Sequence, residues 1–243
     1  MTFRMVARVL VMAVLLILYL PVYGLFRLFG AHMRIVSHYL GRVAWLLGLR
    51  ITAKGVPARG NALYVANHIS WLDIPALCGI TPARFIAKSE IAGWSLIGWL
   101  AKLGGSVFVR RQSRSETRVQ ANAVSAALTE GVPVVLFPEA GTGDGVTLSP
   151  FRPSLFVSAN EARVIVQPVV LDYGDRQAEI AWPDGAGFVS EMKRMLDRPA
   201  PVRLTLHFLP PLDGATVDRK RLAAETHAAI SKVLGRQSPM PGS

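Results

Sequence analysis

The chain divides into an apolar N-terminal stretch and a longer part in which short apolar runs alternate with mixed ones. Residues 9–26 carry no charged side chain, and eighteen residues is about the minimum length for a helix that crosses the hydrocarbon core of a bilayer. Pro21 would kink such a helix, so a re-entrant or interfacial helix is an alternative to a spanning one. A cleaved signal peptide is disfavoured because residues 20–24 offer no small-x-small cleavage site.

Residues 33–47 show a second pattern, in which apolar side chains repeat at the spacing of a helix. Arg34, His38 and Arg42 fall on a separate stripe, so the segment predicts an amphipathic helix. Such a helix suits the lipid interface, but packing on the folded domain explains the pattern equally well. Arginines flank the apolar stretch on both sides, so charge does not fix its orientation in a membrane.

From residue 49 onward, strand-like and helix-like segments alternate, which predicts an α/β domain with a mainly parallel central sheet flanked by helices. The predicted strands are short apolar runs at residues 62–66, 83–87, 106–109, 133–137, 164–171, 178–182 and 202–208. The predicted helices lie at residues 74–79, 94–103, 114–129, 154–161, 188–196 and 218–234. We therefore expect anchoring and interfacial helices over residues 1–48, one α/β domain over 49–236 and a loose tail over 237–243.

The composition narrows the range of partners. Mean hydropathy is +0.35, and the formal net charge is +11, from 27 Lys and Arg against 16 Asp and Glu. This positive charge suits binding to nucleic acid or to an anionic membrane. The basic residues lack the aromatic ladder of a protein that binds single-stranded nucleic acid, so we expect an anionic membrane as the partner and no nucleic acid. The single cysteine, Cys78, cannot form an internal disulfide. The five histidines lack metal-ligand spacing, so we expect no metal site.

Residues 67–73, Asn-His-Ile-Ser-Trp-Leu-Asp, are the first segment that suggests chemistry. His68 and Asp73 follow a predicted strand and can meet only if the backbone turns between them. A carboxylate bound to an imidazole fixes the ring tautomer and makes the other nitrogen a better base. Neither Ser70 nor Cys78 sits in a Gly-x-Ser-x-Gly elbow, so the nucleophile would be a substrate hydroxyl. Taken alone, His68 is more readily explained as a structural histidine at a strand end.

Two further segments also lie at predicted strand ends, where chemistry collects in such sheets. Residues 105–111, Gly-Ser-Val-Phe-Val-Arg-Arg, end on Arg110 and Arg111, which should face opposite sides; a guanidinium suits a phosphate or carboxylate. Residues 137–145 run from Phe-Pro-Glu into a glycine-rich loop that lets the backbone approach a ligand closely. Separately, these segments are explained by a solvated arginine pair and a turn.

In this order, His-x4-Asp, Gly-x-x-Phe-Val-x-Arg and Phe-Pro-Glu resemble the motifs of the glycerolipid acyltransferase family, whose best-known members are the 1-acylglycerol-3-phosphate acyltransferases. The resemblance spans residues 49–170, and residues 166–169 match the family's Val-Pro-Val element. It implies that His68 is the general base and Asp73 its orienting partner. It implies substrate-binding roles for Lys88, Arg111, Glu139, Gly141, Thr142 and Arg152.

One position departs from the family pattern, in which Phe-Pro-Glu is followed by Gly-Thr-Arg-Ser. Here Thr142 replaces the arginine that contacts the acceptor's phosphate. Losing such a charge-assisted contact costs about 1.5–3 kcal/mol unless Arg110 or Arg152 compensates. The form Glu-x-x-Thr-x-Asp-Gly is similar to members that acylate lyso-ornithine lipid, whose head group has no phosphate.

The resemblance implies a membrane-bound O-acyltransferase that moves a fatty acyl group from acyl-carrier protein or coenzyme A to a lysolipid hydroxyl. The expected reaction converts 1-acylglycerol-3-phosphate to phosphatidic acid in phospholipid synthesis, with lyso-ornithine lipid as the alternative acceptor. No cofactor is expected, because a thioester is already activated. The expected location is the cell inner membrane, with the domain facing the cytoplasm. Residues 91–103, apolar nearly all round, could line the acyl channel, dip into the bilayer or simply pack in the core.

Other classes of function remain open from sequence. A lipid hydrolase or thioesterase would use water in place of the lysolipid. A catalytically silent membrane-binding protein would keep the basic surface without needing His68.

Overall fold

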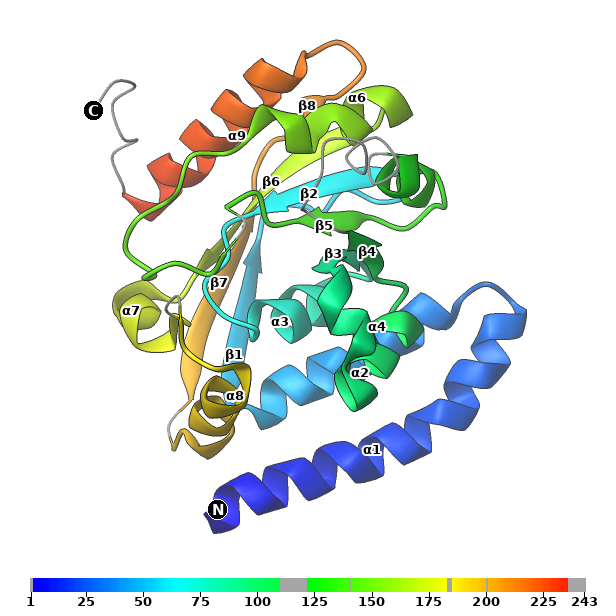
Figure 1. The fold of residues 1–243 in the computed structure, drawn as a ribbon, viewed down its shortest axis with the longest axis vertical. Helices are drawn as coiled ribbons and strands as arrows, with labels where there is room; N and C mark the ends of the chain where they lie inside the picture. The colour runs from blue at the N-terminus through cyan, green and yellow to red at the C-terminus, as the bar shows by residue number, and fades with distance from the viewer. Residues whose placement is uncertain (1, 110–121, 140, 183–184, 200, 236–243) are drawn as a thin grey trace.

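The computed structural model describes residues 2–109, 122–139, 141–182, 185–199 and 201–235, which form an eight-stranded sheet with helices on both faces (Figure 1). This confirms the predicted α/β class. The strands are β1 (Leu49–Lys54), β2 (Ala62–Ala66), β3 (Arg84–Lys88), β4 (Val107–Val109), β5 (Val134–Leu136), β6 (Ile165–Asp172), β7 (Val202–Phe208) and β8 (Leu212–Asp213).

The strand order is β1-β7-β6-β2-β5-β3-β4, with β8 paired to β6. From β6 to β4 every neighbouring pair is parallel, whereas β7 runs antiparallel to β6 and β1 runs parallel to β7. The sheet is therefore mainly parallel, as the sequence predicts. The carboxyl ends of β2, β5 and β6 consequently meet at one edge, where a site can form.

Two layers of helices cover the sheet (Figure 1). One face packs against α2, α3 and α8, with α1 outside α2, and the other packs against α6, α9 and the helical residues 122–128. The helices are α1 (Phe3–Leu28), α2 (His32–Leu46), α3 (Asp73–Ile80), α4 (Ser95–Leu103), α6 (Val157–Ala162), α7 (Gln177–Ile180), α8 (Phe188–Asp197) and α9 (Arg219–Leu234), with short 3-10 turns η1 (Ser89–Gly93), η2 (Pro153–Phe156) and η3 (Gly174–Arg176).

Strand β2 lies at the centre of the sheet and is buried along its whole length. Ala62, Tyr64 and Ala66 join the core under α2 and α3, while Leu63 and Val65 join the core under α9. Because successive strand residues face opposite sides, a strand covered on both faces reads as a continuous apolar run. This burial fixes the position at which the chain leaves β2 toward residues 67–73.

The prediction of a strand at residues 178–182 was wrong. Residues 177–180 form α7, and its buried side chains are Gln177 and Ile180, at helical spacing. A five-residue apolar run does not distinguish a strand from a short helix. The sequence patterns also missed the edge strand β1 and the two-residue β8, while the start of the predicted helix over 114–129 lies outside the described residues.

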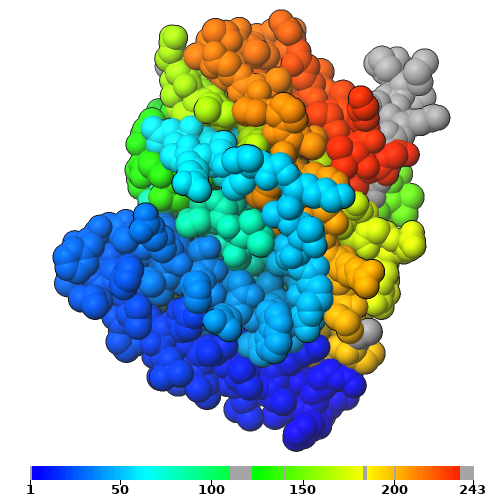
Figure 2. Space-filling model, turned by 180° about the vertical axis from the view of Figure 1, so that it is seen from behind, coloured from blue at the N-terminus to red at the C-terminus, as the bar shows by residue number. Residues whose placement is uncertain are grey.

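Helix α1 is apolar enough and long enough, at 26 residues, to cross a membrane, and its most apolar window is 6% buried. Both ends are bound to the domain: Arg4 and Arg8 donate to carbonyls at the end of α8, and Tyr23 donates to the carbonyl of Leu103. Figure 2 shows α1 as the blue edge of the molecule, and its exposed apolar side chains indicate membrane association. They include Leu10, Val14, Ile17, Leu18, Leu25 and Leu28.

The predicted amphipathic helix is α2, which packs on α3 while Arg34, His38 and Arg42 are exposed. Packing on the domain therefore accounts for its buried side. Helices α2 and α3 approach each other at Gly41 and Gly79, where a Cβ added to Gly79 would lie 2.6 Å from the Cα of Gly41.

We expect Gly79→Ala to lower the free energy of unfolding by about 1–3 kcal/mol, because the methyl group forces α2 away from α3. Thermal unfolding of the full-length protein in one detergent measures this. Gly24→Ala in α1 is the matched control, since a Cβ there meets no atom within 4 Å. Equal unfolding temperatures for the two variants would contradict the close crossing.

Candidate active site

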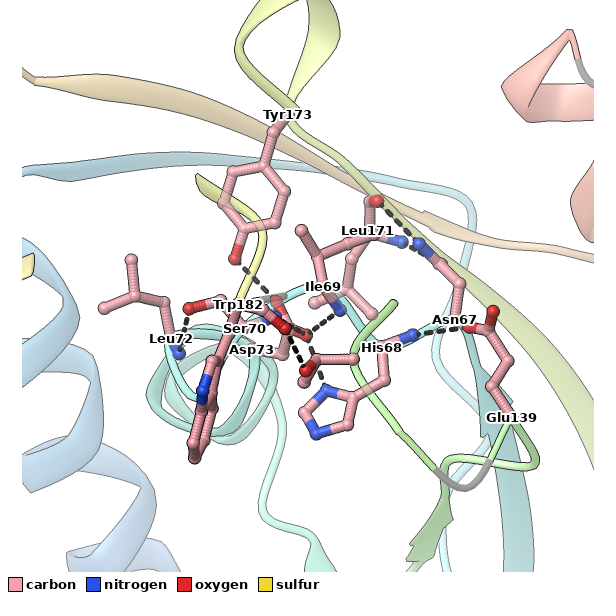
Figure 3. Close-up of polar contacts among 11 residues, drawn as sticks. Asn67, His68, Ile69, Ser70, Leu72, Asp73, Glu139, Leu171, Tyr173 and Trp182 are labelled. Atoms are coloured by element: carbon pink, nitrogen blue, oxygen red, sulfur yellow. Dashed lines mark hydrogen bonds and ion pairs between the residues drawn. The ribbon is translucent and has the colours of Figure 1, made fainter. Parts of the chain in front are cut away.

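The turn that follows β2 is held to the neighbouring strand β6 by the side chain of Asn67. Its Nδ2 donates to the carbonyl of Leu171 at 3.0 Å, and its Oδ1 accepts from the backbone N–H of Leu171 at 2.8 Å (Figure 3). Asn67 is fully buried, and the amide side chain takes the place of one more backbone pair between the strands. The chain is thus fixed at the residue before His68.

His68 and Asp73 meet across this turn, as the sequence predicts. The distance from His68 Nδ1 to Asp73 Oδ2 is 2.8 Å; the Asp73 side chain is fully buried and that of His68 is 19% exposed. Asp73 Oδ2 also accepts the backbone N–H groups of Ile69 and Ser70, at 2.7 and 2.9 Å. The carboxylate therefore orders the turn and the imidazole together, from the first residue of α3.

The His68 ring stacks on Phe137, with ring centroids 4.0 Å apart and planes 11° from parallel. This contact leaves the imidazole little freedom to rotate. With Nδ1 directed at Asp73, the Nε2 edge points away from the carboxylate (Figure 3). His68 also lines a cavity of about 810 Å³, within the range of about 300–1,000 Å³ usual for ligand pockets.

The cavity walls are mostly apolar and come from several elements. Helices α1 and α2 form one wall through residues such as Leu20 and Tyr39. Trp71, three residues after His68 in the chain, also lines the cavity. The predicted apolar segment 91–103 contributes a further set: Ile91, Trp94, Ile97, Leu100, Ala101 and Leu103. That segment lines the cavity and does not simply pack in the core.

The third motif contributes from the end of β5. Glu139 Oε1 accepts the backbone N–H of His68, and Oε2 accepts that of Ser149, both at 3.0 Å. The Thr142 hydroxyl donates to the backbone carbonyl of Trp182. The backbone N–H of Trp182 in turn donates to the carbonyl of Ile69 at 2.9 Å. The first and third motifs are thus joined through these backbone contacts.

The remaining predicted site residues differ in position. Lys88, Gly141 and Thr142 line the cavity with His68. Arg152 is exposed at the start of η2, away from the described cavity lining. Arg111 lies outside the described residues.

Sequence reasoning missed two residues of the site. Tyr173, at the end of β6, donates its hydroxyl to Asp73 Oδ1 at 2.7 Å, and Trp182 joins the two loops described above. A polar aromatic residue two positions after a predicted strand was the available signal for Tyr173, but nothing in its spacing related it to Asp73.

The two side chains considered as covalent nucleophiles are unsuited to that role. Ser70 is 1% exposed, and its Oγ accepts the backbone N–H of Leu72. Cys78 is fully buried, and burial raises the pKa of its thiol to about 11, so the thiol stays protonated near neutral pH. A substrate hydroxyl remains the nucleophile that this arrangement accommodates.

A family model described as Acyltransferase matches residues 50–172, the part of the chain that holds His68, Asp73 and Glu139. The chain therefore belongs to the acyltransferase family. A lyso-ornithine lipid O-acyltransferase from Pseudomonas aeruginosa is 33% identical over 204 residues, covering 83% of this chain and 78% of that protein. A 1-acyl-sn-glycerol-3-phosphate acyltransferase from Neisseria gonorrhoeae is 40% identical over 129 residues, or 53% of this chain and 51% of that one. The predicted family and the enzyme class, acyl transfer to a lysolipid, are confirmed.

The fold also matches a solved structure over nearly its whole length. The crystal structure of the 1-acyl-sn-glycerophosphate acyltransferase PlsC from Thermotoga maritima superposes with a TM-score of 0.66 at 22% identity, covering 97% of this chain and 98% of that one. The match includes the N-terminal helices as well as the α/β domain.

We expect Asp73→Asn to lower kcat by about 10²-fold or more, because the amide no longer stabilises a charged imidazole. KM for the lysolipid should change little, since Asp73 is buried behind His68. Steady-state acyl transfer measures both constants. Asp175→Asn, an exposed aspartate in η3, is the control and should leave kcat unchanged; an equal loss in both variants would contradict the assignment.

Proposed function

We propose that this protein transfers a fatty acyl group from an acyl thioester to the hydroxyl of a lysolipid, with His68 as general base and Asp73 as its orienting partner. One observation supports these roles above all. The imidazole is held at 2.8 Å by a buried carboxylate and lines a large apolar cavity. Such a cavity shelters an acyl chain from water beside the imidazole, which limits hydrolysis of the thioester.

In the proposed reaction, Nε2 of His68 removes the proton as the hydroxyl oxygen attacks the thioester carbonyl. The tetrahedral intermediate then collapses, the carbon–sulfur bond breaks, and His68 returns the proton to the departing thiolate. The products are a new ester and a thiol carrier, and the imidazole ends neutral. Such general-base catalysis contributes about 10²–10⁴ in rate, and the thioester needs no cofactor to activate it.

The cavity is the proposed site of the acyl chain. Its described lining is dominated by aliphatic and aromatic side chains from α1, α2 and α4. Because α1 carries an exposed apolar surface as well as part of the cavity wall, we expect an acyl chain to reach His68 from the lipid phase along this helix. The hydrogen bonds at both ends of α1 favour a helix lying along the membrane surface. We propose the cytoplasmic face of the inner membrane because acyl thioesters reside in the cytosol.

We favour lyso-ornithine lipid as the acceptor. Threonine at position 142 has no charge with which to bind a phosphate, and its hydroxyl already donates to the carbonyl of Trp182. Lys88 and Glu90, both exposed and both lining the cavity, carry the opposite charges that suit a carboxylate and an ammonium group. The Pseudomonas relative, named for this acceptor, aligns over most of the chain.

Lysophosphatidate is the second candidate, because the Neisseria relative named for that acceptor is 40% identical over 129 residues, about half of this chain. The donor is acyl-carrier protein or coenzyme A, and the net charge of +11 suits an anionic membrane around the site.

An acceptor panel tests this function. Full-length protein in vesicles is supplied with a labelled fatty acyl group bound as a thioester to either acyl-carrier protein or coenzyme A. Each donor is tested with lyso-ornithine lipid, with lysophosphatidate and with no acceptor. We expect thiol release to require an acceptor and to be fastest with lyso-ornithine lipid. Release without an acceptor would instead identify a hydrolase.

His68→Ala should abolish transfer in the same assay while vesicle binding persists, because α1 is unchanged.

Thr142→Arg should improve kcat/KM for lysophosphatidate by about tenfold or more relative to lyso-ornithine lipid, by adding a charge-assisted contact. Thr142→Ser keeps the hydroxyl and should keep the original preference. Activity in His68→Ala would refute the base role, and an unchanged preference in Thr142→Arg would remove position 142 from the acceptor site.

The acyl-chain assignment has its own test in α4. Leu100→Trp should fill part of the cavity and lower kcat/KM for long-chain donors by about tenfold or more, with little effect on short-chain donors. Leu96→Trp on the same helix is the control, since Leu96 is 58% exposed and outside the described cavity lining. A uniform loss for all chain lengths would count against an acyl chain at this position.

A further inference from the structure

The second carboxylate oxygen of Asp73 has a partner that the proposed mechanism leaves unused. Oδ2 serves His68, Ile69 and Ser70, whereas Oδ1 accepts the hydroxyl of Tyr173 at 2.7 Å (Figure 3). Tyr173 is 2% exposed and lies on the opposite side of Asp73 from the imidazole, above Asp73 in the view of Figure 3. It does not line the described cavity, so it acts on substrate only through Asp73.

The sheet brings Tyr173 to this place although 100 residues separate it from Asp73. Strands β2 and β6 are parallel neighbours with Ala66 opposite Val169, so both chains leave the sheet at the same edge. The Asn67 side chain then bonds to both backbone groups of Leu171, two residues before the tyrosine. These contacts set the height of the phenol relative to the turn that carries His68.

The protonation state of Tyr173 suits a permanent donor. Burial, and then the negative charge of Asp73, raise the pKa of the Tyr173 hydroxyl well above its usual value, against a smaller opposing effect of Arg198. The phenol therefore keeps its proton wherever the carboxyl group is ionised. A donor to a carboxylate favours the ionised form of that carboxylate.

A carboxylate bonded only through Oδ2 can rotate about its Cβ–Cγ bond. The Tyr173 hydroxyl fixes the other oxygen, so the carboxylate plane is set from both ends. His68 then donates from Nδ1 in one geometry, and the Nε2 lone pair remains available on the cavity side. Among the residues that the structure describes, Glu139 accepts the backbone N–H of His68, and Lys88 and Glu90 are charged groups that line the same cavity as the imidazole.

We propose that Tyr173 is a positioning residue for catalysis: its hydroxyl holds the Asp73 carboxylate in one orientation, and so keeps His68 in the tautomer that accepts a proton at Nε2. This rests on the proposed role of His68 as base. It assigns a role in the reaction to a side chain that touches neither substrate nor imidazole. A purely structural tyrosine would affect only the stability of the fold.

The test compares Tyr173→Phe with Tyr64→Phe in the full-length protein. Tyr64 is a matched control because it is fully buried in the same core and its hydroxyl donates to the backbone carbonyl of Ala58, away from the site. We expect Tyr173→Phe to lower kcat by about 10- to 100-fold, the range that one hydrogen bond to a charged group accounts for. KM should change less than about twofold, and Tyr64→Phe should retain the kcat of the unmodified protein.

A spectroscopic signature separates positioning from stability. In protein labelled with ¹⁵N-histidine, the His68 signals, identified by their loss in His68→Ala, should report the Nδ1–H tautomer and become a mixture of tautomers in Tyr173→Phe. In an Asp73→Asn background, Tyr173→Phe should cause no further loss of kcat, because the two residues act as one unit. Thermal unfolding of each variant shows that the loss is not due to misfolding.

The outcomes are distinguishable. A Tyr173→Phe enzyme with unchanged kcat, or with an unchanged His68 tautomer, overturns the positioning role while leaving acyl transfer by His68 intact. An additive loss in the Asp73→Asn background overturns it as well. An active His68→Ala enzyme refutes the proposed function itself.

Discussion

The site depends on one buried negative charge. A carboxylate removed from water costs several kcal/mol unless donors surround it, and Asp73 is fully buried. Its four described donors come from the imidazole of His68, two consecutive backbone N–H groups and the phenol of Tyr173. Satisfying this one ion therefore forces the turn after β2, the start of α3 and the end of β6 to converge. The position of the imidazole is a consequence of that convergence.

The parallel sheet makes this convergence possible. Because β5, β2 and β6 are adjacent and point the same way, Glu139, His68 and Tyr173 all emerge at one edge, although the chain between them is long. The loops are then joined by backbone contacts, Glu139 to the N–H of His68 and Trp182 to the carbonyl of Ile69. Helices α1, α2 and α4 supply much of the apolar wall of the cavity, and Trp71, Phe137 and Trp182 from the site's own loops complete it. The helices thus add apolar volume to a polar arrangement that the sheet edge sets.

The sequence was sufficient for the parts of the site whose signal is local. His68 and Asp73 are five residues apart, and only one backbone path lets them meet, so their contact followed from spacing and strand position. Glu139 and Thr142 were recognisable by the order of motifs. Tyr173 was not, because its partner is distant in sequence and the register of β2 against β6 had to be known first.

The errors in the fold have a similar cause. Residues 178–182 are too few to distinguish a helix from a strand by periodicity, and Ile180 is buried either way. Strand β1 was missed because, at the edge of the sheet beside β7, it carries charged and polar side chains between its apolar ones. The central strands β2 and β6, buried along all or most of their length, were predicted nearly to the residue, since burial on both faces leaves a continuous apolar run.

The wall formed by α1 has a consequence for how this protein can be handled. Leu16, Leu20 and Tyr23 face the interior hollow, while Ile17 and Leu18 on the same turns face outward. Deleting the first 28 residues to gain solubility would remove a side of the hollow and admit water next to His68. Helix α1 is therefore a structural part of the cavity. A strong detergent that detaches α1 from the domain is expected to abolish activity without unfolding the sheet.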